Sequence, residues 1–163
     1  MSVWVCRTGS DGRFNDLFFD KSQIYLTREN LDYDVSLVEK EEILSHLHAE
    51  MSTAAKQTIS NIWSQINIFA NKMKINDVVL IPKKGQFSIS VAIITGEYCF
   101  NDNAQYPEKH SRTIRVLKKD IDTTSFPRDI FHSIGAFRTI FEIKEADRLI
   151  AVLKKKGVNF DEI

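Results

Sequence analysis

The sequence has few of the features that would assign it to a class at once. Of its 163 residues only two are cysteine, Cys6 and Cys99, and they form neither a CxxC pair nor a disulfide framework. A reducing, cytoplasmic setting is therefore expected. No apolar run approaches the about 18 residues that span a bilayer, and the N-terminus lacks the pattern of a secretory signal. We expect no membrane segment.

Motifs of known chemistry are also missing. The sequence contains no Walker lysine motif, no GxSxG elbow and no HExxH. His110 and His132 have no carboxylate or cysteine at ligand spacing. Glu142 and Lys144 form an E-x-K pair like that of metal-dependent nucleases, but no aspartate lies on a matching preceding strand. We expect a binding domain with no catalytic residues, no metal and no cofactor, and a nuclease remains the weakest alternative.

Charge is balanced overall but unevenly distributed. The 22 basic and 22 acidic residues cancel, which does not favour nucleic acid as a partner. Residues 28–50, however, hold seven acids against two bases. The rest of the chain has a basic surplus, much of it at Lys83–Lys84 and in 109–119. This pattern is compatible with one basic face and also with ordinary solvated charge.

The stretch 60–82 organises the predicted fold. Ile62, Ile66, Phe69 and Met73 recur at helical spacing, and Ser60 can cap the start of that helix. The β-branched run 78–81 then predicts a buried strand. Trp63 lies at the edge of the apolar stripe. It can form a ligand wall or pack under a neighbouring strand, and spacing leaves both interpretations open.

The remaining patterns predict about six strands with short helices between them. The expected strands are 2–7, 23–27, 78–81, 87–96, 112–118 and 139–143, and the other expected helices are 14–20, 39–50, 128–133 and 145–156. Regular helices do not separate the strands, so a doubly wound fold is not expected. The pattern favours an α+β fold with a small, curved, mixed or antiparallel barrel. We expect one domain over 1–144, with 145–163 as a C-terminal helix and possible linker.

Five motifs in order resemble a known family. They are Trp4-x-x-Arg7-x-Gly9-x-x-Gly12, the stretch Gln65-Ile66-x-x-Phe69-x-Asn71-x-Met73-Lys74-Ile75-x-Asp77-Val78-Val79, Gly96-Glu97-Tyr98, the run 110–117 and the run 134–139. Together they resemble the N-terminal domain found ahead of Mrr-type restriction endonuclease domains. That domain is similar to the EVE and YTH members of the PUA-like superfamily.

The resemblance implies a PUA-like curved β-barrel that reads a modified base. Such a domain holds the base, flipped out of its stack, in an aromatic-walled pocket. The implied partner is modified DNA in a restriction or defence system, and a nuclease domain can follow in a longer parent protein. A reader of modified RNA and a protein-interaction domain remain alternatives.

Site residues follow by position from the same resemblance. The family has I-G-W after its second strand, whereas Tyr25-Leu26-Thr27 follows Ile24 here, so other aromatics must supply the wall. Trp63 and Tyr25 are expected to stack on the base, and Asn61 and Ser64 to form hydrogen bonds with its edge. The residues expected to hold phosphates are Arg7, Arg28, His110 and Arg112. Each of them also has a structural interpretation.

Overall fold

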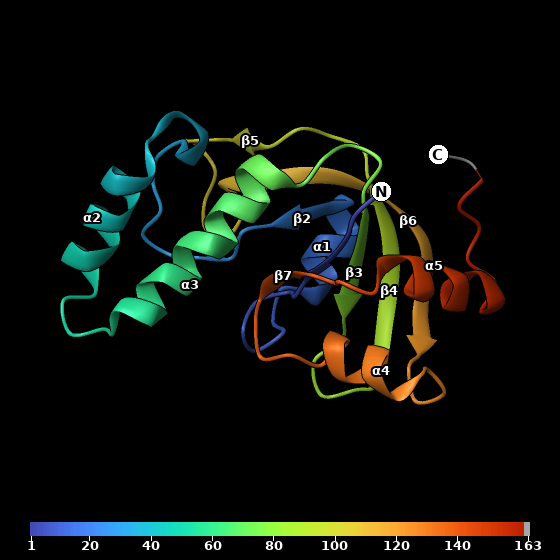
Figure 1. Ribbon diagram of the computed structural model, residues 1–163. Helices are drawn as coiled ribbons and strands as arrows, with labels where there is room; N and C mark the ends of the chain where they lie inside the picture. The colour runs from blue at the N-terminus through green and yellow to red at the C-terminus, as the bar shows by residue number, and fades with distance from the viewer. Residues whose placement is uncertain (162–163) are drawn as a thin grey trace.

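A single curved sheet forms the centre of the computed structural model, which describes residues 1–161 (Figure 1). Six strands follow the order β2-β6-β4-β3-β1-β7, and β5 pairs with β6 beside this path. The strands are β1 (Val3–Cys6), β2 (Gln23–Tyr25), β3 (Val78–Pro82), β4 (Ser88–Ile94), β5 (Cys99–Phe100), β6 (His110–Asp122) and β7 (Ile140–Glu142). β1 runs parallel to β3, and the other pairs are antiparallel.

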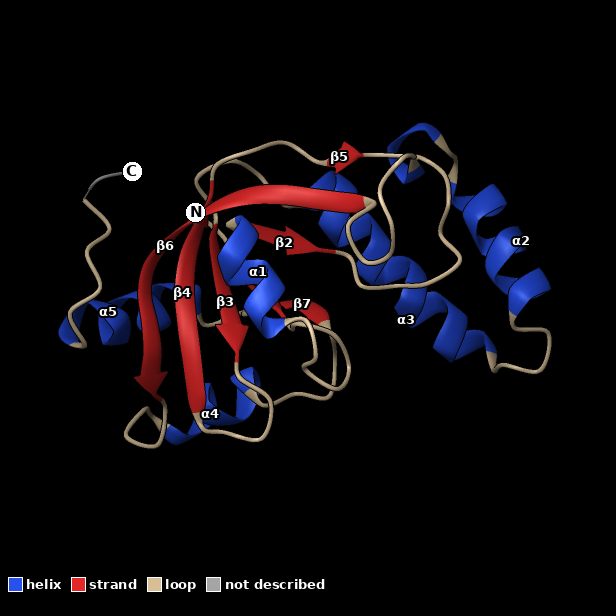
Figure 2. Ribbon diagram, turned by 180° about the vertical axis from the view of Figure 1, so that it is seen from behind, coloured by secondary structure: helices blue, strands red, loops and turns tan. Residues whose placement is uncertain are grey.

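Short helices surround the sheet. They are α1 (Asn15–Lys21), a 3-10 turn η1 (Val35–Leu37), α2 (Lys40–Glu50), α3 (Lys56–Asn67), a π-helical turn η2 (Ile68–Lys72), α4 (Arg128–Ile134) and α5 (Ala146–Lys155). α2 and α5 lie at opposite ends of the molecule (Figures 1 and 2). No helix within residues 1–161 has the length and apolarity needed to cross a membrane.

The long strand β6 gives the sheet its curvature. It has 13 residues, pairs with β4 along one part and with β2 and β5 along another, and so joins two halves of the sheet. Its register with β4 shifts twice between Ile89 and Ala92. Such irregularities bend and twist a strand, and Figure 2 shows β6 curling around the neighbouring strands. The expected α+β fold, with a curved mixed sheet and short flanking helices, is confirmed.

Alternation along the strands divides the interior into two cores. Trp4 and Cys6 of β1 face one core, together with buried side chains of α1, α2 and α3. Val3 and Val5 face the other, together with buried side chains of α4 and α5. Because successive strand residues point to opposite faces, helices on both sides are needed to keep the sheet from water.

Trp4 anchors β1 in the core. Its side chain is 3% exposed, and its indole Nε1–H donates to Asp77 Oδ2 at 2.9 Å. Asp77 also accepts hydrogen bonds from the backbone N–H groups of Ser2 and Lys74. A single carboxylate therefore ties the start of β1 to the turn before β3.

Several expected boundaries are wrong. α3 begins at Lys56, with Ala55 before it, so Ser60 lies inside the helix and caps nothing. β6 starts two residues before the expected 112 and ends four after 118. A 3-10 turn also lies between β2 and α2. The ends of α3 and β6 were misplaced because polar residues occupy them, and these show no apolar period.

The C-terminal helix belongs to the folded unit. Leu149 and Leu153 of α5 are fully buried, and Val158 and Phe160 beyond it are also buried against the same core. These buried side chains pack α5 and the residues just after it against the sheet. A connection from this helix to a further domain stays a prediction.

Candidate functional site

A cavity of about 400 Å³ lies where α3 meets four other segments of the chain. Its lining comes from α3, from the loop 8–13 between β1 and α1, from the loop after β2, and from the segments around 106 and 139. The lining residues are Ser10, Arg13, Leu26, Thr27, Arg28, Glu29, Ile62, Gln65, Ile66, Tyr106 and Thr139. Most of these side chains carry hydrogen-bonding groups. The volume is within the range of roughly 300–1,000 Å³ usual for small-ligand sites.

Two glycines shape the loop that carries Arg13 into this cavity. Gly9 and Gly12 have φ values of 95° and 75°, in the left-handed region that favours glycine. A Cβ on Gly12 would collide with the side chain of Lys84, so the loop packs directly on the turn between β3 and β4. The positive φ values and this packing identify Gly9 and Gly12 as turn glycines.

Arg13 and Tyr106 form one wall of the cavity. The Arg13 guanidinium lies 4.8 Å from the centre of the Phe14 ring and 5.8 Å from that of Tyr106. It also donates to the Tyr106 hydroxyl at 3.4 Å, and that hydroxyl donates to Thr27 O at 3.2 Å. Phe14 meets the Tyr106 ring edge-on, with 5.5 Å between ring centres. These contacts hold a flat cation and a flat ring beside the cavity.

Gln65 is the polar group best placed to select a ligand. It lies on α3 and lines the cavity. Within residues 1–161 its side-chain amide has no hydrogen-bond partner. The amide therefore offers a free donor and a free acceptor.

A larger groove of about 760 Å³ adjoins the first cavity, because Ser10, Gln65 and Thr139 line both. The turn between β3 and β4, helix α4 and the loop 134–139 form its other walls. Among the described residues, none of those lining this groove is aspartate or glutamate. Part of the predicted basic surplus, Lys83–Lys84, lies here.

Two of the eight residues expected at a site line these cavities. Arg28 lines the smaller one, where its guanidinium also pairs with Glu50 at 3.4 Å, and Arg7 lines the larger one. The other six line neither cavity.

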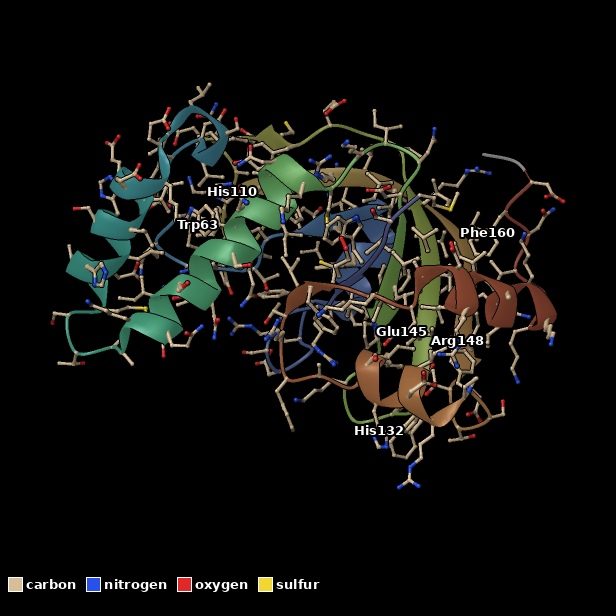
Figure 3. The ribbon with its side chains drawn as sticks, viewed as in Figure 1. Trp63, His110, His132, Glu145, Arg148 and Phe160 are labelled. Carbon is tan, nitrogen blue, oxygen red and sulfur yellow. The ribbon has the colours of Figure 1, made fainter. Side chains whose placement is uncertain are left out.

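Trp63 lies on the side of α3 that faces α2, as Figure 3 shows. It is half-buried, and Lys40 Nζ of α2 lies 4.2 Å from the centre of its ring. Asn61 and Ser64 are exposed on the same helix, and Asn61 accepts from Gln57 at 2.9 Å. The structure does not bring these three residues together around a cavity, and it places Trp63 between two helices.

Tyr25 is a core residue and not a pocket wall. Its side chain is 1% exposed, and its ring meets Phe18 edge-on at 5.4 Å. Its hydroxyl donates to Gln23 Oε1 at 2.8 Å. Burial raises the pKa of this phenol to about 12. A base cannot stack on a ring that is covered on both faces by the protein.

The two expected phosphate ligands Arg7 and Arg112 instead bind backbone carbonyls. Arg112 is 2% exposed and donates to the carbonyls of Phe69, Gly96 and Ala70 at 2.7, 3.2 and 3.3 Å. Burial lowers the pKa of both guanidinium groups. Arg112 satisfies carbonyls at the end of α3–η2 that the helix leaves without partners.

His110 is likewise held inside the fold, near the end of the molecule that carries α2 (Figure 3). It is 1% exposed, and both ring nitrogens have partners. Because a carbonyl only accepts, Nε2 carries the hydrogen and donates to Leu31 O at 2.6 Å. Nδ1 then accepts from the Tyr98 hydroxyl at 2.6 Å. Neutral histidine fits this site, and burial lowers the pKa of His110.

Acidification should therefore destabilise the fold through His110. Because its pKa is lower in the folded state, the stabilising contribution is complete above the ordinary value of about 6.5. It is lost as pH falls below that value, since the unfolded chain then binds the proton more readily. Urea unfolding at pH 8, 7, 6 and 5 should show a steeper loss of stability in the wild-type protein than in His110→Gln.

His132→Gln is the matched control, because His132 lies on α4 at the other end of the molecule, without such burial (Figure 3). Its pH profile should follow that of the wild type. Equal profiles for His110→Gln and the wild type would contradict the assignment of the neutral tautomer.

The sequence did not single out Arg13, Gln65 or Tyr106 as site residues. Gln65 stands inside one of the family-like motifs and Arg13 directly follows Gly12, the last residue of another. Membership of a motif, or a position next to one, was the available signal for these two residues. Nothing local in the sequence places Tyr106 beside Arg13, because 93 positions separate them.

Comparison with known proteins adds one family. The sequence profile described as "Domain of unknown function (DUF8426)" matches residues 5–144. No curated protein matches the chain.

Two solved structures show a distant likeness. The NMR structure of Rpa0253 from Rhodopseudomonas palustris is 12% identical with a TM-score of 0.48, over 96% of this chain and 94% of that one. The crystal structure of the YTH domain of Zygosaccharomyces rouxii MRB1 protein, in complex with N6-methyladenosine RNA, is 10% identical with a TM-score of 0.47. It covers 94% of this chain and 85% of that chain.

Proposed function

The chain belongs to the domain-of-unknown-function family DUF8426, and we propose that it is a nucleic-acid-binding reader domain. The ligand is a modified base of DNA, flipped out of its stack into the cavity between α3 and the loop 8–13. In a modification-dependent restriction or defence system, such a domain supplies specificity while a separate nuclease domain cuts. The observation that carries the proposal is the composition of this cavity.

The cavity offers each kind of contact that a flipped base needs. Loss of stacking costs a few kcal/mol, and a planar arginine or aromatic ring can replace it. Arg13 and Tyr106 are held in place for this role. Gln65 presents a free amide to the base edge, and Arg28 provides a second cation for the backbone phosphates. This set replaces Trp63 and Tyr25 as the proposed base-binding residues.

The choice of DNA over RNA rests on the resemblance to the domain ahead of Mrr-type endonucleases. An RNA reader would need to sense the 2′-hydroxyl. Binding experiments should therefore include matched DNA and RNA strands in parallel.

Gln65→Leu is expected to remove the preference for a modified base. A pair of base-edge hydrogen bonds gives about 1–3 kcal/mol of discrimination, so the preference should fall by about tenfold. The measurement is fluorescence anisotropy with labelled oligonucleotides, unmodified or carrying methyladenine, methylcytosine or hydroxymethylcytosine. Salt-dependent binding to the unmodified strand should remain within about twofold.

Gln57→Leu provides the control on the same helix, since Gln57 is exposed and lines neither cavity. It should behave as the wild type. Preference for modified RNA over modified DNA would move the function to the RNA alternative. Wild-type binding that ignores every modification would exclude a reader role.

A further inference from the structure

The larger groove has features that the base-binding cavity does not explain. Phe87 is 66% exposed and Phe137 is fully exposed, at 106% of the reference value. Both line the groove together with Lys83, Lys84 and Arg138. Side chains this exposed contribute little burial, so packing does not require phenylalanine at either position. Exposed aromatic groups beside cations commonly mark an interaction surface.

Phe137 lies on a loop whose backbone is held by hydrogen bonds. The Arg7 guanidinium donates to the carbonyls of Ile134, Ala136 and Arg138, each at 3.0 Å. In addition, the Arg138 N–H donates to Ala136 O at 2.8 Å and closes a tight turn with Phe137 at its apex. The loop is thus fixed from inside, while the ring of Phe137 points into solvent.

Phe87 has a comparable support. Its ring lies against that of Phe131 on α4, with 5.4 Å between ring centres and 55° between the planes. One face of Phe87 is backed by protein and much of the ring remains accessible. The groove therefore presents Phe87 on a supporting ring and Phe137 on a loop whose backbone is held by hydrogen bonds.

The charge of the groove limits the classes of ligand that it can bind. Arg7, Lys83, Lys84 and Arg138 are its lysines and arginines, and none of its described lining residues is acidic. A ligand with regularly spaced negative charge is favoured by such a surface. Exposed aromatic rings add a second requirement, because they can stack only on bases whose faces are free. A duplex hides those faces, whereas an unpaired strand presents them.

We infer that this groove binds single-stranded nucleic acid on one side of the flipped base, with Phe137 and Phe87 stacking on unpaired bases. Lys83, Lys84 and Arg138 contact the phosphates between them. The inference rests on the proposed function, since the groove shares Ser10, Gln65 and Thr139 with the base cavity. The packing of Gly12 on Lys84 joins the two sites physically.

The stacking part is tested by Phe137→Leu and Phe137→Trp, with a labelled mixed-sequence single strand of twelve nucleotides, its RNA equivalent and the DNA duplex. One base–aromatic stack is worth about 1–3 kcal/mol. Phe137→Leu should therefore weaken single-strand binding about tenfold, and Phe137→Trp should restore it. Leu37→Ala is the control, because Leu37 is an exposed apolar residue outside both cavities. Phe87→Leu repeats the test at the second ring.

The phosphate part is tested by the double variant Lys83→Ala/Lys84→Ala. Loss of two phosphate contacts should reduce the salt slope of the logarithm of the binding constant by about 1.4, at ~0.7 for each contact on a single strand. The control, Lys154→Ala/Lys155→Ala, removes the same charge from exposed positions on α5. It should leave the slope unchanged.

The outcomes separate this inference from the function on which it rests. Groove variants should lower affinity for modified and unmodified strands equally, whereas Gln65→Leu should weaken binding of the modified strand more than binding of the unmodified strand. If the groove variants bind like their controls while the preference for a modified base persists, only the proposed role of the groove is overturned. Groove-dependent binding with no preference would overturn the reader role alone. Binding of acidic peptides in place of any nucleic acid would overturn both.

Discussion

Replacing Arg112 with methionine is expected to lower the free energy of unfolding by about 3 kcal/mol. The variant removes a buried cation that donates to three backbone carbonyls. Hydrogen bonds from a charged group are worth about 1.5–3 kcal/mol, and each carbonyl left buried without a partner adds a cost. Urea unfolding followed by tryptophan fluorescence measures the change. Arg112→Lys should recover less than half, because one ammonium cannot reach all three carbonyls at the spacing of a guanidinium.

The matched control is Arg128→Met, at an exposed arginine on α4. Surface substitutions usually change stability by no more than about 0.5 kcal/mol. If Arg112→Met were as stable as this control while losing oligonucleotide affinity, Arg112 would be a phosphate ligand, as the family resemblance implies. A large loss of stability would identify it as a structural residue that helps to hold β6 against the end of α3–η2.

Replacing Asp77 with alanine is expected to cost about 3 kcal/mol of stability as well. Its carboxylate accepts from Trp4 Nε1, Ser2 N and Lys74 N at 2.9, 3.1 and 3.0 Å. Without it, the buried indole N–H of Trp4 has no acceptor, and the turn before β3 loses its tie to β1. The same urea titration measures the loss, with exposed Asp20→Ala as the control expected near zero.

A double-mutant cycle makes this assignment sharper. Trp4→Phe removes the indole donor and keeps an aromatic ring in the core. If Asp77 acts through Trp4, the combined variant should be less destabilised than the sum of the two single variants, by at least about 0.5 kcal/mol. Strictly additive losses would show that the other two hydrogen bonds of Asp77 account for its effect.

The local sequence pattern was sufficient to predict the helices and strands that bury an uninterrupted apolar face. The run 78–81 is β-branched and aliphatic, and it became a strand buried along its whole length. The spacing of Leu149 and Leu153 likewise predicted α5, and Gly157 has the positive φ expected after a helix. Such segments are specified by their own residues. The start of α3 was missed because polar residues occupy its first turn.

The candidate site could not be predicted in this way. Five segments distant in sequence form the smaller cavity, and each contributes only one to four residues. Resemblance to a family motif indicates which positions are constrained, but it does not say whether the constraint is on folding or on ligand binding. Arg7, His110 and Arg112 stand in such motifs. The backbone carbonyls that they contact lie 42 to 131 positions away along the chain, with one nearer, at Gly96. Sequence alone cannot distinguish a cation that binds a phosphate from one that binds a carbonyl.

The separation of charge in this neutral chain has a kinetic consequence. Helix α2, which lies in the acidic stretch 28–50, stands at one end of the molecule, away from α4 and the turn between β3 and β4 (Figures 1 and 2). That turn and α4 contribute to the groove, whose described lining residues include no acid. The molecule is therefore an electric dipole. An approaching polyanion exerts a torque that turns the groove toward it and the α2 end away. Encounters then begin in a productive orientation, and this advantage fades once added salt shortens the Debye length to about 10 Å or less.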